Sequence, residues 1–187
     1  MGHVLHVCTA NQIRSAMAER MMRAALRARH GDAAAGLRVV SAGVNAWDGA
    51  PMFPEALDEL RRRGIDADDF RSTVIDADMI DEAYLVLVAT PWHRDMVLTV
   101  APGAEASVFT WRELAWLLAD VTREDVAGRT PHARVAAVAA LAAERRAKLG
   151  PAPDPVHVAD PIGGPVEGYR RAADEIEAAL APLLVLL

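Results

Sequence analysis

The stretch VCTANQIRS, residues 7–15, decides both the fold and the chemistry that the sequence predicts. It follows a run at 3–7 that is typical of a buried strand, and it precedes an amphipathic helical pattern over about 15–29. A loop between a strand and a helix lies at the carboxyl end of the strand, where open α/β sheets bind ligands. Its backbone N–H groups converge, which suits an anion such as phosphate. We therefore expect an anion site in this loop.

Two side chains six residues apart in this loop indicate covalent phosphate chemistry. The loop N–H groups and the helix dipole favour a thiolate, so we expect Cys8 to be a nucleophile at neutral pH. Arg14 carries a planar fork that binds two phosphate oxygens. Asn11 tolerates the left-handed backbone of a tight loop, and Ser15 can donate a hydrogen bond to the sulfur. The alternative is that Cys8 is an inert core residue, as cysteines after buried strands commonly are.

Composition narrows the class of protein. The 187 residues fit one domain, and 52% hydrophobic with 25% charged residues describe a soluble globular chain. A net charge of -6 argues against a nucleic-acid partner. A single cysteine excludes an intrachain disulfide and favours a reducing compartment. The start of the sequence lacks signal-peptide features, and the apolar run 183–187 is too short to span a bilayer, so we expect a cytoplasmic protein without a membrane partner.

The rest of the sequence predicts an α/β protein: a three-layer α/β/α sandwich around a four-stranded parallel sheet. The further strands are expected over 37–41, 84–88 and 107–110, and the further helices over 54–63, 78–83, 91–100 and 166–186. The run 112–150 is helical in pattern, with breaks near Gly128 and Pro131, and 151–155 is an extended linker. We expect residues 1–187 to form one domain, with 112–150 as a helical elaboration.

Cys8, Asn11, Arg14 and Ser15 together resemble the N-terminal signature of the low-molecular-weight protein tyrosine phosphatases, which is a strand followed by Cys, five residues, Arg and Ser. The resemblance implies a phosphate-binding loop after the first strand. The residues of this loop that bind phosphate would be Thr9, Ala10, Asn11, Gln12, Ile13 and Ser15.

The resemblance extends to three sites farther along the chain. Ser41-Ala42-Gly43 is similar to a turn whose serine braces the phosphate loop, and Trp47 falls where some members have a tryptophan lining the substrate groove. Asp160-Pro161 resembles the loop that carries the general acid. Asp154-Pro155 is a second candidate for that loop, although its spacing to the last helix fits less well.

The resemblance implies a phosphatase that hydrolyses a phosphate monoester without a metal or other cofactor. Cys8 would attack phosphorus, Arg14 would hold the phosphoryl oxygens, and Asp160 would protonate the leaving oxygen and then activate water. Ile162 and Gly163 replace the aromatic residues that follow Asp-Pro in many members. The substrate could therefore be a phosphotyrosine protein or a small-molecule phosphate.

Two other functions remain open from the sequence alone. A single-cysteine arsenate reductase coupled to an external thiol is compatible with Cys8. A phosphate-binding module without turnover is the second alternative, although the intact Cys8, Arg14 and Asp160 argue against it. No histidine spacing indicates a metal site, and we expect His6 and His93 to be ordinary structural residues.

Overall fold

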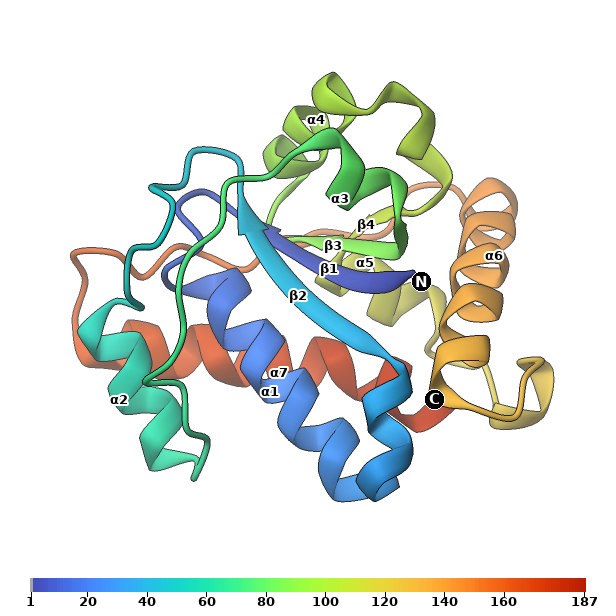
Figure 1. Ribbon diagram of the computed structural model, residues 1–187. Helices are drawn as coiled ribbons and strands as arrows, with labels where there is room; N and C mark the ends of the chain where they lie inside the picture. The colour runs from blue at the N-terminus through green and yellow to red at the C-terminus, as the bar shows by residue number, and fades with distance from the viewer. Residues whose placement is uncertain (1) are drawn as a thin grey trace.

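The protein is built around a four-stranded parallel sheet (Figure 1). The computed structural model describes residues 2–187, and the strand order is β2-β1-β3-β4. The strands are β1 (His3–Cys8), β2 (Arg38–Gly43), β3 (Ala83–Val88) and β4 (Val108–Thr110). The α/β/α sandwich with four parallel strands is therefore confirmed.

Helices cover both faces of the sheet (Figure 1). One layer contains α1, α2, α5, α6 and α7, and the other contains α3 and α4. The α-helices are α1 (Arg14–His30), α2 (Pro54–Arg62), α3 (Ala77–Asp81), α4 (Pro91–Val100), α5 (Trp111–Leu117), α6 (Pro131–Leu149) and α7 (Val166–Leu186). The short 3-10 helices are η1 (Gly31–Gly36), η2 (Pro102–Ala106) and η3 (Arg123–Asp125). No helix within residues 2–187 is long and apolar enough to cross a membrane.

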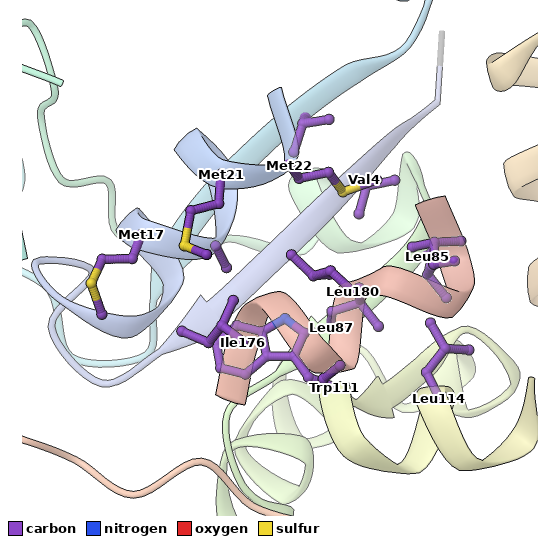
Figure 2. Packing of buried hydrophobic residues seen from close by; sticks show 14 of the residues in the cluster. Val4, Met17, Met21, Met22, Leu85, Leu87, Trp111, Leu114, Ile176 and Leu180 are labelled. Carbon is purple, nitrogen blue, oxygen red and sulfur yellow. The ribbon is translucent and has the colours of Figure 1, made fainter. Parts of the chain in front are cut away.

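Alternation along the central strands produces two separate cores. Val4, Leu85 and Leu87 point to the face covered by α1 and α7, whereas Leu5 and Val86 point to the opposite face. Figure 2 shows the larger core, in which side chains from β1 and β3 meet those of α1, α5 and α7. Because the central strands are buried on both sides, β3 reads as a continuous apolar run, whereas the run of β1 is interrupted by His3 and His6.

The boundaries differ from the sequence prediction where local patterns carry little information. The third helix ends at Asp81, and Ala83 already belongs to β3. The segment predicted as helical over 112–150 is two α-helices, α5 and α6, joined by a connection that contains η3. Residues 31–36 form η1, which the sequence did not predict, because an alanine-rich run of six residues has no amphipathic face.

Candidate active site

The loop that joins β1 to α1 leaves its backbone donors without acceptors in the described part of the chain. Cys8 is the last residue of β1, and α1 begins at Arg14. Ile13 occupies the N-cap position and has no side-chain hydrogen bond to the helix. Among the residues that the structure describes, none accepts a hydrogen bond from the backbone N–H groups of residues 9–14. These donors and the positive end of α1 suit a tetrahedral oxyanion.

Asn11 fixes the shape of the loop. It is fully buried and is the only non-glycine residue with positive φ, at 53°, in the described chain. Its Nδ2 donates to the hydroxyls of Ser15 and Ser41 at 2.8 Å each, and its Oδ1 accepts from the backbone N–H of Thr73 at 2.8 Å. These three bonds satisfy the buried amide and offset the cost of the left-handed backbone.

The Cys8 side chain lies beneath this loop. It is 3% exposed, and its Sγ lies 3.1 Å from Ser15 Oγ. Ser15 Oγ also lies 3.3 Å from the carbonyl oxygen of Ala42, so its hydrogen has two acceptors within reach. The sulfur is therefore within hydrogen-bond distance of a hydroxyl group, and not in a purely apolar pocket.

A chain of polar contacts extends from Asn11 through Ser41 to Glu19. Ser41 donates to Glu19 Oε2 at 2.6 Å, and Glu19 also pairs with Arg23 at 3.0 Å. Burial raises the pKa of Glu19, while the hydrogen bond from Ser41 and the charge of Arg23 act in the opposite direction. Ser41, the serine that the resemblance expects to brace the loop, thus contacts the loop through Asn11.

Arg14 reaches across the mouth of the loop to a segment far along the chain. Its side chain is 4% exposed, and its Nη1 donates to the carbonyl oxygen of Val158 at 3.2 Å. Its Nη2 pairs with Asp160 Oδ2 and lies 3.5 Å from Thr9 Oγ1. The structure therefore brings Asp160, 146 residues away, to the loop that begins at Cys8.

Gly43 allows β2 to approach the loop closely. A Cβ atom at this position would lie 2.5 Å from the carbonyl oxygen of Thr9 and 2.8 Å from the backbone nitrogen of Asn11. The turn after β2 also donates to the loop, from Val44 N to Cys8 O at 3.0 Å. The loop is thus supported by backbone on its β2 side.

The other predicted loop residues differ in how far they are buried. Ile13 is buried, whereas Thr9, Ala10 and Gln12 are half-buried, and Gln12 Nε2 donates to the carbonyl oxygen of Pro51 at 2.9 Å.

Trp47 lies between β2 and α2 with its side chain 83% exposed. Among residues 2–187, no three side chains of the metal-ligating types are grouped to hold a metal ion.

One contact at the loop involves a residue that the sequence analysis interpreted as purely structural. His93 is buried, its Nε2 lies 3.0 Å from Thr9 Oγ1, and its Nδ1 lies 2.7 Å from Thr90 Oγ1. Burial, and then the charge of Arg14, lower the pKa of His93 to about 4. This contact could have been anticipated from the sequence, because Thr90 and His93 follow β3, and β3 pairs with β1, after which Thr9 lies.

Comparisons with known proteins agree with this geometry. The model of the family described as "Low molecular weight phosphotyrosine protein phosphatase" matches residues 3–125. A protein-arginine-phosphatase of Geobacillus stearothermophilus is 29% identical over 177 residues, which cover 95% of this chain and 90% of the relative. A probable low molecular weight protein-tyrosine-phosphatase, EpsP, of Ralstonia solanacearum is 31% identical over 111 residues, 59% of this chain and 71% of the relative.

A solved structure is similar over the whole chain. The YwlE arginine phosphatase from Geobacillus stearothermophilus superposes with a TM-score of 0.67 at 30% sequence identity, covering 98% of this chain and 91% of that one. With the family model matching well over half of the sequence, the resemblance of the Cys8–Ser15 signature is confirmed. The chain belongs to the low molecular weight phosphotyrosine protein phosphatase family and is a cysteine-dependent phosphatase.

Proposed function

We propose that this phosphatase removes phosphoryl groups from phosphorylated side chains of proteins, with Cys8, Arg14 and Asp160 as its catalytic residues. The observation that carries the assignment is the contact of Arg14 with Asp160 above the loop that begins at Cys8. In support, the guanidinium of Arg14 and the carboxyl group of Asp160 meet beside Thr9, the residue that follows Cys8. The alternatives of arsenate reduction and of binding without turnover are not favoured, because an acid beside the phosphoryl site suits hydrolysis, in which the leaving atom has to be protonated.

In the proposed reaction, the Cys8 thiolate attacks phosphorus and forms an S–P bond while the bond to the leaving atom breaks. The loop N–H groups and Arg14 hold the phosphoryl oxygens, which replace Asp160 on the guanidinium. Asp160 gives its proton to the leaving atom. Water then attacks the phosphocysteine, Asp160 takes up its proton, and the S–P bond breaks to release phosphate and the thiolate.

Phosphoarginine is the substrate side chain that we propose to be preferred. In support, the sequence match to the relative named protein-arginine-phosphatase spans nearly the whole chain, whereas the match to the named tyrosine phosphatase spans 59% of it. In addition, the two residues that follow Asp160-Pro161 are Ile162, which is 57% exposed, and Gly163, which has a φ of 71°. Neither carries an aromatic ring that could flank a tyrosine.

The experiment compares kcat/KM on two peptides of one sequence that carry phosphoarginine or phosphotyrosine, beside a panel of small-molecule phosphates. Preference for the phosphoarginine peptide by a factor of about ten or more supports the proposal. Equal turnover, or preference for phosphotyrosine or for a small molecule, overturns it. Cys8→Ser, tested in the same assay, should abolish turnover on every substrate while still binding inorganic phosphate.

We further propose that residues 1–187 form one phosphatase domain acting in a reducing compartment, the cytoplasm. In support, α6 contributes Val135, Val138 and Ala142 to the same core as α1 and α7. Cys8 has no partner cysteine in the sequence, so its reduced state depends on its surroundings.

A further inference from the structure

We propose that His93 is a positioning residue of this phosphatase: through the Thr9 hydroxyl it fixes the direction in which Arg14 presents its guanidinium to the phosphoryl group. This inference rests on the proposed role of the loop after Cys8 as the phosphoryl site. It does not depend on which phosphorylated side chain is preferred.

The geometry joins three elements in one line of contacts. Thr90 Oγ1 caps α4 by accepting from the backbone N–H of His93 at 3.4 Å, and it lies 2.7 Å from His93 Nδ1. The other ring nitrogen lies 3.0 Å from Thr9 Oγ1, which in turn accepts from Arg14 Nη2 at 3.5 Å. The start of α4 is therefore connected to Arg14 through a single imidazole ring.

The chemistry of the groups makes this connection directional. Arg14 can only donate, so Thr9 Oγ1 must face it with a lone pair. A neutral imidazole has one donor and one acceptor nitrogen, so in either tautomer it holds both threonine hydroxyls. Because His93 is 2% exposed and its pKa is lowered, it stays neutral at the pH values at which a cysteine phosphatase works.

The contact matters most when a phosphoryl group is bound. Arg14 then gives up Asp160, and the protein acceptors that remain on its two terminal nitrogens are Val158 O and Thr9 Oγ1. If the Thr9 hydroxyl were free to rotate, Nη2 of Arg14 would have no oriented acceptor in the protein. Small errors in the direction of such a donor weaken oxyanion binding strongly.

A matched pair of variants tests this inference. The side-chain amide of His93→Asn falls near the position of Nδ1 and reaches Thr90, whereas the amide of His93→Gln falls near the position of Nε2 and reaches Thr9. We expect His93→Asn to weaken competitive inhibition by inorganic phosphate about tenfold and to lower kcat/KM at least as much, since the hydrogen bond that orients the Thr9 hydroxyl toward Arg14 is lost. His93→Gln should retain most of both.

A double-mutant cycle with Thr9→Val separates positioning from general damage to the fold. If His93 acts through the Thr9 hydroxyl, His93→Asn adds no further loss of phosphate affinity in the Thr9→Val background. Equal losses for the Asn and Gln variants, additive losses in the cycle, or unchanged phosphate affinity in His93→Asn would each overturn the inference. Wild-type protein that does not bind inorganic phosphate at all would instead contradict the proposed function.

Discussion

Replacing Asp160 by Asn distinguishes the role of Asp160 as the general acid from its role in the stability of the fold. The Asp160 side chain is 37% exposed, pairs with Arg14, and accepts from the backbone N–H of Ile162 at 3.2 Å. Asparagine has nearly the same shape but only one oxygen acceptor, so it can keep one of these two contacts, which use different carboxylate oxygens. It also lacks the exchangeable proton and the charge.

The expected effects on stability and on catalysis therefore differ in size. An ion pair this exposed on one side contributes at most about 1 kcal/mol, so the free energy of unfolding should change by no more than that. Loss of a positioned acid lowers the rate by about 10²–10⁴, equivalent to about 3–5 kcal/mol in the barrier. The loss should be largest for a substrate with a strongly basic leaving group and small for p-nitrophenyl phosphate, whose leaving group hardly needs a proton.

The matched control is Asp154→Asn, because Asp154 lies in the other Asp-Pro pair and is exposed. Single-turnover rates of both variants on the two classes of leaving group, together with urea unfolding of each variant, decide which aspartate is the general acid. We expect Asp154→Asn to match wild type on both. An equal loss on both leaving groups in Asp160→Asn, or a larger loss in Asp154→Asn, would refute the assignment of the acid.

Three further changes test the surroundings of the site. His6 and His93 are buried, with pKa values lowered to about 3 and about 4 by burial, so protons bind the unfolded chain first as the pH falls through 6.5. The free energy of unfolding should drop by about 2 kcal/mol per histidine between about pH 7 and 5, and denaturant unfolding that is flat over this range would contradict it. Gly43→Ala sets a Cβ 2.5 Å from Thr9 O and should lower kcat/KM at least about tenfold, which steady-state kinetics will check. Arg134→Met removes the donors to three backbone carbonyl oxygens and should lower the unfolding free energy by about 2–3 kcal/mol in urea titrations, while leaving the KM unchanged.

Local sequence patterns carried most of the fold. The uninterrupted apolar run of β3 and the long periodic pattern of α7 predicted their elements within a residue, because burial of a strand on both faces and of one helix face leaves a direct mark on the sequence. The start of α1 was placed one residue late. Cys8, Asn11 and Arg14 could be placed in one loop from the sequence because that loop is a local structure, whose spacing does not depend on the rest of the chain.

The contacts between distant segments could not be read in this way. His93 meets Thr9 across 84 residues, and only the pairing of β3 with β1 brings them together. The carbonyl oxygen of Val158 contacts Arg14 through the backbone, so its side chain gives no signal. The resemblance pointed to an Asp-Pro pair, and spacing to the last helix favoured Asp160 over Asp154, but the position of the segment before α7 depends on tertiary packing.

The most direct test of the mechanism is to stop the reaction with acid during turnover and measure the mass of the peptide that contains Cys8. Since Cys8 is the only cysteine of the chain, a thiol-bound phosphoryl group has a single possible site. The proposed reaction predicts that this peptide gains the mass of one phosphoryl group in wild type and that Cys8→Ser releases no phosphate. Steady release of phosphate by Cys8→Ser, with no adduct on the wild-type peptide, would contradict it.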